Sequence, residues 1–432
     1  MKVIDHAAVS QNVTFLPQEV LTLVVTYIRV HRAARVAQHD VWACCLVGRT
    51  WYDAAIEQLY EAPYLSPRNF SQFASIISGS VTSRRRVGLE DFVQRLDMGS
   101  LAYESKKSLT SRLISRTKAS LRSFVAPAVS FSTTSLAPLS KCAKLELLDL
   151  SRDVYDFDYK RLMNSIGTLD LLKWLSLPKD CGLFVSVHET ADCDSRNVPP
   201  WPPNLKSLQI NESYAMPNGA TWTRLLQGLP SSLQSLSLRG LTVFDPFDTI
   251  GQAEVEVASV TDLTIGVSRS DDTYYFNHMC KPFPNLTKIT VPAMTSWVLK
   301  SFLFTSQDST WSISSNENQP GQLRPPQQLE LLILEESPDF PTSSHIRLAD
   351  LKQFVDSCSK LMRIDVPEAY LSIDEDDDAA LDELNDVLTR RTKQLEGGTR
   401  QLRIDSAGIF MTERPHDTGV GMKRSFRYRG GD

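Results

Sequence analysis

A short leucine motif recurs along most of the chain and constrains its fold more than any other feature. The leucines of one copy cannot be covered by that copy alone, so neighbouring copies must stack to form a continuous core. Successive copies start 27, 33, 28, 27, 26, 43 and 32 residues apart. The eight copies fit L-x-x-L-x-L with apolar substitutions and are LELLDL from Leu145, LKWLSL from Leu172, LKSLQI from Leu205, LQSLSL from Leu233, VTDLTI from Val260, LTKITV from Leu286, LELLIL from Leu329 and LMRIDV from Leu361.

This spacing is typical of leucine-rich repeats, in which each unit supplies one strand and one helix. Helical stretches such as TWTRLLQGL and LADLKQFVDSCSKL separate several units. We therefore predict an α/β fold, a curved solenoid with irregular repeats over residues 66–410, and a disordered tail over 411–432. Two polar inserts, near 178–203 and 306–328, explain the longest gaps. Weaker copies of the motif are VQRLDM from Val93, LRSFVA from Leu121 and TRQLRI from Thr399.

The first part of the chain has helical periodicity in place of the repeat. Apolar residues at helical spacing predict a helix from about 17 to 31, with Pro17 in its first turn. A second helix is expected further on, with one apolar stripe from Val47 to Leu59 and a neighbouring stripe from Tyr52 to Tyr60. A module of about fifty residues is too small to bury both faces in its own core. The second face therefore needs another surface.

Motifs for common enzyme chemistry are absent from the sequence. It contains no G-x-x-x-x-G-K-[ST], G-x-G-x-x-G, H-E-x-x-H or G-x-S-x-G. The adjacent Cys44 and Cys45 lack the spacing of a zinc-binding pair, and Cys181, His188 and Cys193 are unevenly spaced. We expect no catalytic residues, no metal and no cofactor.

Charge and hydropathy narrow the choice of partners and compartment. The formal net charge is -5, unlike the basic footprint of a nucleic-acid-binding protein. The apolar stretch Phe15–Val30 is too short to span a bilayer. No secretory signal follows Met1, and seven scattered cysteines do not form a compact disulfide framework. We expect no nucleic acid, no membrane and an intracellular protein of the cytoplasm or nucleus.

Two segments concentrate charge locally. The basic segment from Arg84 to Phe124 is either a solvated helix face or a patch for an acidic or phosphorylated segment of a partner. The acidic run from Asp374 to Asp378 is either a helix start, favoured there by the helix dipole, or an exposed loop.

Two pieces of the N-terminal module carry a family resemblance. FLPQEVLTLVVTYI and, after a variable loop, CLVGRTWYDAAIEQLYEAPYL resemble an F-box, whose hallmark is L-P-x-E-(I/L/V) and a later L-V-(C/S)-(R/K)-x-W-(Y/F). The match covers residues 15–65, after an extension over 1–14, and LYEAPYL is similar to the fungal F-box/leucine-rich-repeat proteins. Gly48 departs from the family's Cys or Ser. The residues that match the motif are Leu16, Pro17, Val20, Leu46, Val47, Trp51 and Tyr52.

The resemblance implies a function in protein recognition. In that family the F-box binds the Skp adaptor, and through it cullin, in an SCF-type ubiquitin ligase, while the repeats hold a protein substrate. The matching residues would then form the adaptor-facing or core set. Alternation along the strands points other side chains to the open, concave face. The substrate-binding candidates there are Asp149, Ser176, Gln209, Ser237, Arg239, Thr264, Lys288, Thr290, Arg363 and Asp365.

Three hypotheses of different classes result. The first is a non-catalytic substrate receptor of a ubiquitin ligase. The second is a leucine-rich scaffold or inhibitor whose N-terminal helices only cap the solenoid, and it predicts that the faces of Trp51 and Tyr52 are buried within the chain. The third is an enzyme with an unrecognised site.

Overall fold

The computed structural model describes most of the repeat region and the N-terminal helices. The predicted TRQLRI unit, His188, Cys193, Arg84 and most of both inserts lie outside the described residues. The described ranges are 16–79, 88–101, 107–152, 159–179, 181–183, 201–211, 219–241, 255–267, 280–293, 299, 327–336, 346–367, 370–372, 378–395, 407–412 and 425–427.

One long sheet follows the order of the chain. Its strands pair parallel from the first to β13, and β14 is added antiparallel at the end. All eight strong copies of the motif and two of the weaker ones supply strands, which confirms the predicted α/β solenoid. The strands are β1 Arg95–Asp97, β2 Ser123–Val125, β3 Leu147–Asp149, β4 Trp174–Ser176, β5 Ser207–Asn211, β6 Ser235–Leu241, β7 Asp262–Val267, β8 Lys288–Pro292, β9 Leu331–Glu335, β11 Arg363–Pro367, β13 Gly408–Thr412 and β14 Ser425–Arg427; β10 Ile346–Arg347 and β12 Leu371–Ser372 form a separate pair.

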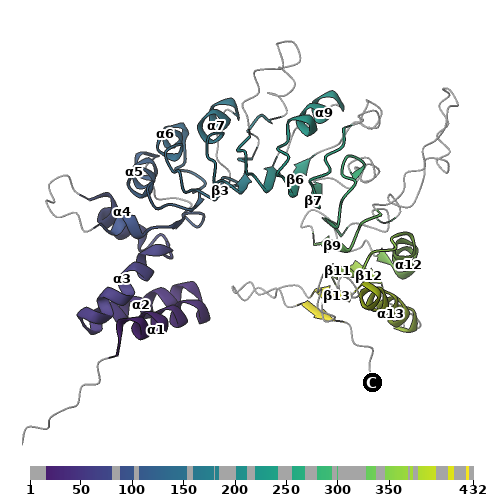
Figure 1. Ribbon diagram of the computed structural model, residues 1–432, viewed down its shortest axis with the longest axis horizontal. Coiled ribbons are helices and arrows are strands. Elements are labelled where there is room, and N and C mark those ends of the chain that lie inside the picture. The colour runs from purple at the N-terminus through teal and green to yellow at the C-terminus, as the bar shows by residue number, and fades with distance from the viewer. Residues whose placement is uncertain are drawn as a thin grey trace, which may run out of the picture.

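The described helices cover one face of this sheet. Figure 1 shows an arc with the strands along its inner edge and the helices outside. Among the described residues, the inner, concave face is therefore free of helices. The outer elements are α4 Phe70–Ser78, η1 Leu89–Phe92, α5 Lys107–Thr117, η2 Thr133–Ser135, α6 Leu136–Leu139, α7 Tyr159–Ile166, α9 Gly219–Gly228, α12 Leu348–Ser357 and α13 Asp378–Leu395.

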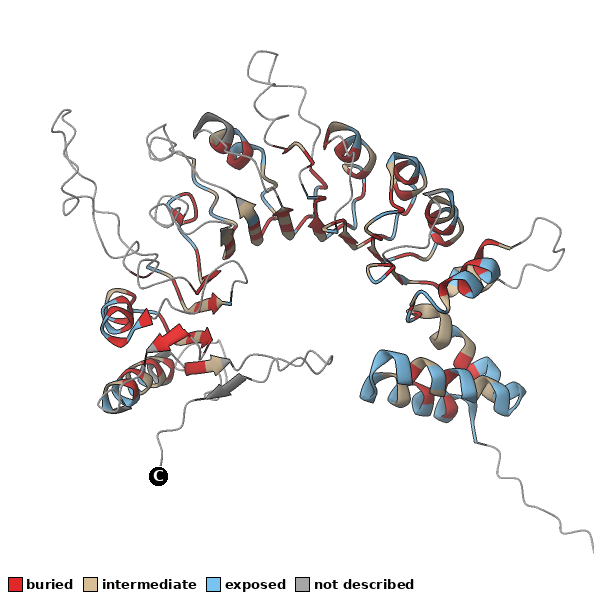
Figure 2. Cartoon of the chain, turned by 180° about the vertical axis from the view of Figure 1, so that it is seen from behind, coloured by how far each residue is buried: buried red, intermediate tan, exposed pale blue. Residues whose placement is uncertain are grey.

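The motif residues form a continuous core between strands and helices. The fourth residue of each unit occupies equivalent register positions and is almost fully buried, as at Leu148, Leu175 and Leu208 (Figure 2). A backbone ladder also joins the units, because the amide of Glu146 donates to the carbonyl of Arg122 and that of Lys173 to Glu146. The same bond recurs from unit to unit as far as Gly408. The strand pitch is thus constant while the outer connections vary in length.

The C-terminal end corrects one prediction. The tail from residue 411 was expected to be disordered, yet β13 runs through Phe410 to Thr412 and pairs with β11. Strand β14 then pairs antiparallel with β13. The reason is that the apolar segment around Ile409 continues the core of the preceding unit.

The N-terminal module contains three helices, α1 Gln18–His31, α2 Ala34–Val47 and α3 Arg49–Glu61. The helix predicted from 17 to 31 is confirmed by α1. The second predicted helix is confirmed by α3 for the residues after Gly48, which include Leu59 and the stripe from Tyr52 to Tyr60. Its start at Val47 is wrong, because Val47 ends α2 and Gly48 lies between the helices with an extended backbone, φ 171° and ψ 175°. That residue ends the helical hydrogen-bond series, so residues before and after it do not share one face.

The module has its own small core. Val25, Val41 and Ala55 form a buried cluster that is separate from the large core of the solenoid. The two parts meet at the end of α3, where the amide of Gln94 donates to the carbonyl of Glu61 at 2.9 Å. Leu65 belongs to the solenoid core, and the module boundary at residue 65 stays a prediction.

Candidate functional site

An apolar stripe of α1 faces solvent. The inward face of this helix is made by Leu21, Val25 and the partly buried Ile28. The opposite stripe has the same helical spacing, no element in the described part of the chain covers it, and Tyr27 in it is 66% exposed. Exposed apolar patches on a folded protein mark contact sites for other molecules. The exposed apolar residues of α1 and of the segment just before it are Leu16, Val20, Leu23, Val24, Tyr27 and Val30.

A second exposed apolar group lies at the end of α2 and the start of α3. Leu46 and Val47 are 66% and 67% exposed, and Tyr52 is 39% exposed. Trp42, also exposed, lies one turn earlier on α2, with its ring 5.8 Å from that of His39.

Most of the predicted motif residues lie on these surfaces. Leu16, Val20, Leu46, Val47 and Tyr52 are exposed, and so is Pro17 just before α1, whose carbonyl accepts the amides that start the helix. Trp51 differs, because it is partly buried and packs against the small core of the module. Sequence reasoning missed Leu23, Tyr27, Val30, Val36 and Trp42, although the spacing of Leu23 and Tyr27 from Leu16 and Val20 continues the stripe.

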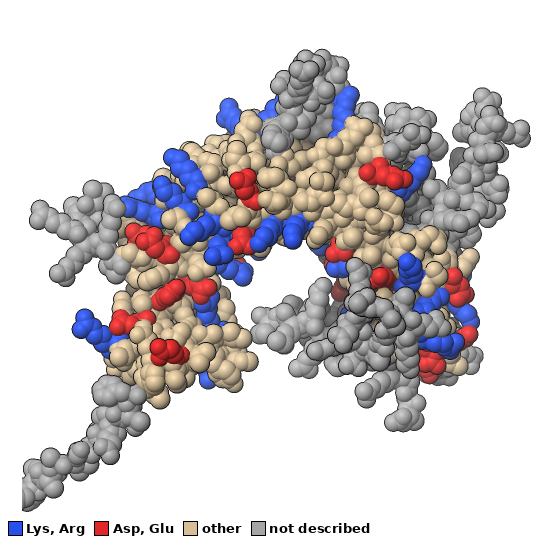
Figure 3. Space-filling model, viewed as in Figure 1, with Lys and Arg blue, Asp and Glu red and all other residues tan. Residues whose placement is uncertain are grey.

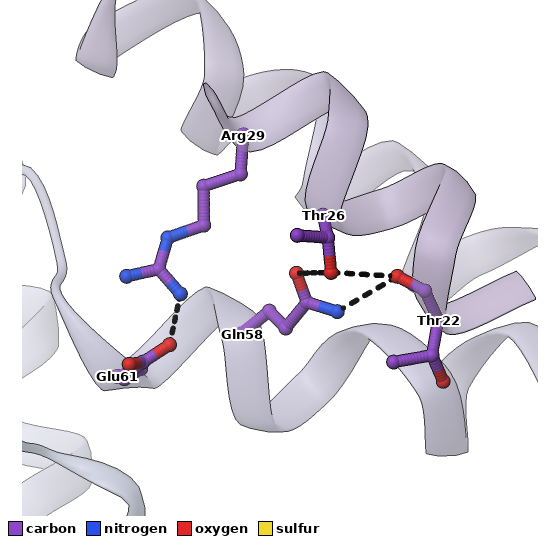
Figure 4. A network of polar contacts seen from close by, with 5 residues as sticks. All are labelled: Thr22, Thr26, Arg29, Gln58 and Glu61. Atoms are coloured by element: carbon purple, nitrogen blue, oxygen red, sulfur yellow. Dashed lines mark hydrogen bonds and ion pairs between the residues drawn. The ribbon is translucent and has the colours of Figure 1, made fainter. Parts of the chain in front are cut away.

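Polar contacts hold α1 against α3. Gln58 Nε2 donates to the Thr22 carbonyl at 3.2 Å, and Gln58 Oε1 lies 3.2 Å from the Thr26 hydroxyl, which itself donates to the Thr22 carbonyl at 2.8 Å. One turn further on, Arg29 forms an ion pair with Glu61 (Figure 4). These side chains fix the inward face of α1, so its apolar stripe must point away from α3.

A cavity of about 470 Å³ lies where the helical module meets the first strand. Its lining includes Arg29, Arg95 and Arg152. Two of these cations already face carboxylates, since Arg29 contacts Glu61 and Arg95 lies 3.3 Å from Asp97. The cavity is thus a loosely packed junction with largely compensated charge.

On the concave face, the predicted substrate-binding residues divide into two groups. Eight of the ten are partly or fully exposed, in agreement with the alternation along the strands. Ser176 and Thr290 are buried, so their assignment to an accessible surface is wrong. Asn211 covers Ser176 and lies within 3.5 Å of its hydroxyl. The short Thr290 lies in register between Thr264 and the larger Ile333.

Several charges of this face are paired with one another. Arg239 and Glu335 lie 3.4 Å apart. Arg363 donates two hydrogen bonds to Asp365, at 2.7 and 3.0 Å, and its guanidinium lies 4.0 Å from the ring centre of Phe410. Within the described ranges no cluster of His, Cys, Asp and Glu could hold a metal ion.

Sequence reasoning also missed much of an outward row at the first position of each strand. Leu147 and Trp174 are neighbours in this row and are partly exposed. Just before these strands, Glu146 accepts hydrogen bonds from Lys173 at 2.7 Å and Arg122 at 3.0 Å, which hold the pKa of Glu146 below its ordinary value. These residues are the third of each L-x-x-L-x-L copy. The alternation along the strand that marks the fifth residue as outward-facing also marks the third, so the sequence could have predicted this row.

Comparisons with known proteins identify relatives. No family model matches the chain. It is 28% identical over 166 residues to F-box protein YDR306C of Saccharomyces cerevisiae, covering 38% of this chain and 32% of that protein. It is 27% identical over 204 residues to Protein pof5 of Schizosaccharomyces pombe, covering 44% of this chain and 56% of that protein. The matches thus span about a third and about half of the relatives' lengths, and they confirm the predicted resemblance to fungal F-box proteins.

Two solved structures resemble the solenoid at low similarity. The leucine-rich repeat-containing protein LegL7 of Legionella pneumophila has a TM-score of 0.41 and 12% identity, with 74% of this chain and 91% of that chain covered. The Q64V53_BACFR protein of Bacteroides fragilis has a TM-score of 0.32 and 15% identity, with 81% and 72% covered. The fold assignment rests on the strands and helices of this chain. No helix in the described ranges combines the length and apolar character needed to cross a membrane.

Proposed function

We propose that this chain, a relative of fungal F-box proteins with a leucine-rich-repeat solenoid, is a non-catalytic substrate receptor of an SCF-type ubiquitin ligase. The helices α1 to α3 bind the Skp adaptor, and through it cullin, while the concave face of the solenoid binds a target protein. Tethering raises the effective concentration of target lysines near the ubiquitin-charged enzyme. No chemistry by this chain is needed.

The observation that carries the proposal is the uncovered apolar surface of the N-terminal module. Its buried cluster is small, and the exposed residues include Leu23, Tyr27, Leu46 and Val47. Apolar area that water would otherwise cover favours association by about 25 cal/mol per Å². A partner that covers both groups would therefore contribute substantially to the free energy of binding.

The scaffold hypothesis is less well supported. If the N-terminal helices only capped the solenoid, the faces of Trp51 and Tyr52 would both be buried within the chain. Trp51 is partly buried, but against the module's own small core, and Tyr52 is 39% exposed. The helical module contacts the solenoid chiefly through the end of α3, where Tyr60 stacks on Phe73 with ring centres 6.3 Å apart. The stripe on α1 contributes nothing to that contact.

The test is co-expression of the full chain with the Skp adaptor. We expect a stoichiometric complex from the wild-type chain and its loss in a Leu46→Ser/Val47→Ser variant, because both residues are exposed and their replacement leaves the core intact. The matched control is Val129→Ser, an exposed apolar residue of the solenoid. A wild-type chain that is stable alone and ignores the adaptor would favour the scaffold hypothesis.

A further inference from the structure

An apolar pair lies on the concave face in its N-terminal half, as Leu331 and Ile333 of β9 do further along. Leu147 of β3 and Trp174 of β4 are in register and partly exposed. The next strands carry the short side chains of Ser207 and Ser235 at the same position. Trp174 therefore has Leu147 on one side and the short Ser207 on the other. Tryptophan at such a position is a frequent centre of binding energy in protein interfaces.

Cations border this pair at one end of the strands. Arg122, Lys173 and Lys206 are exposed and are linked through the backbone ladder of successive units. Glu146 is the carboxylate that contacts two of them. Arg122, Lys173 and Lys206 thus outnumber the two carboxylates nearby, Glu146 and Asp149 of β3. Figure 3 shows Lys and Arg side chains gathered along this part of the inner rim.

In the C-terminal half of the concave face, the charged residues that the structure describes are more evenly paired. Arg239 faces Glu335 there, and Arg363 faces Asp365. Lys288 lies in register beside Asp262. The described cations that outnumber their carboxylates therefore lie beside Trp174.

We propose that Leu147, Trp174, Arg122, Lys173 and Lys206, here called the tryptophan patch, bind a protein segment in which an apolar side chain is flanked by Asp or Glu. The apolar side chain packs on Trp174 and Leu147, and the carboxylates face the cations. Charge complementarity of this kind contributes to specificity and to the rate of association. That the bound segment belongs to a ubiquitination target rests on the proposed function.

The test uses the full chain and short random peptides displayed on phage, followed by fluorescence anisotropy with a labelled synthetic copy of one enriched peptide. We expect enriched peptides with an apolar residue flanked by Asp or Glu. Their binding should weaken about tenfold or more in Trp174→Ser and in Lys173→Gln/Lys206→Gln, and also at high salt. The matched control Lys288→Gln should bind like the wild type.

Each outcome decides the proposal. Enrichment of peptides without acidic residues, no enrichment at all, or equal loss in Lys288→Gln would overturn it. The variant Lys173→Gln/Lys206→Gln changes only exposed side chains and should not disturb the fold. If Trp174→Ser fails to fold, the lysine variant therefore still tests the proposal. Adaptor binding is scored separately: a wild-type chain that binds acidic peptides but no adaptor would refute the proposed function and leave the tryptophan patch standing.

Discussion

Arg239 of β6 and Glu335 of β9 are 96 positions apart in the chain, yet their side chains lie 3.4 Å apart above the concave face. Strands β7 and β8 lie between them. On β7 the register partner of Arg239 is Gly266, where an added Cβ would lie 3.3 Å from Arg239 Cγ. A residue without a side chain near the end of β7 thus leaves room for this long arginine.

This ion pair should contribute little to stability. Both side chains are largely exposed, at 49% and 37%, and exposed pairs typically contribute about 0.2 to 1 kcal/mol. A double-mutant cycle with Arg239→Met and Glu335→Gln, followed by urea denaturation, measures the coupling. We expect a value in this range that shrinks in concentrated salt. A coupling well above it would mean that the pair is shielded from solvent.

Arg391 should be far more important for stability. Its guanidinium in α13 donates to the carbonyl oxygens of Val355, Cys358 and Leu361, at 2.8 to 3.2 Å, around the end of α12. Arg391→Met removes these charge-assisted bonds, although the Val355 and Cys358 carbonyls each keep a backbone amide donor, so we expect a loss of about 1 to 3 kcal/mol. Chemical denaturation measures the loss, and hydrogen exchange should accelerate at the end of α12. The control is Arg390→Met, which replaces the exposed neighbouring residue. Its free energy of unfolding should change by no more than about 0.5 kcal/mol.

The cysteines should differ in their reaction with iodoacetamide near pH 8. Burial raises the pKa of Cys142 and Cys280 to about 12 and that of Cys358 to about 11. A raised pKa lowers the thiolate fraction, and burial blocks the reagent, so these three should be alkylated only after denaturation. Cys44 and Cys45 also have raised pKa values from burial but are partly exposed, so they should react first. Mass spectrometry of the labelled peptides measures the order, and early labelling of Cys280 would contradict the buried core.

Gly48 should accept the residue that the F-box family usually has there. Its φ of 171° is extended backbone that any residue adopts, and an added Cβ would have no neighbour within 4 Å. Gly48→Ser should therefore change the free energy of unfolding by no more than about 0.5 kcal/mol. It should also leave adaptor co-purification at the wild-type level. A marked loss of either would show that the turn between α2 and α3 needs glycine.

Periodicity in the sequence was enough to predict the solenoid and much of its accessible face. The leucines of each unit must be covered by the next unit, so the repeat alone implies parallel strands in chain order and outward positions between the leucines. The spacing of Leu16, Pro17 and Val20 likewise predicted where α1 begins, whereas the face in need of a partner was predicted for the helix after it. These properties depend on residues only a few positions apart.

Contacts between distant units decided the rest. Ser176 is outward by periodicity but buried, because Asn211 of the next strand covers it. The break at Gly48 divides a stripe that looks continuous in sequence. The charge balance beside Trp174 depends on Arg122 and Lys173 meeting one carboxylate from the unit between them. Periodicity assigns a side chain to a face, but its exposure and partners depend on stacked neighbours tens of residues away, which only the tertiary structure brings together.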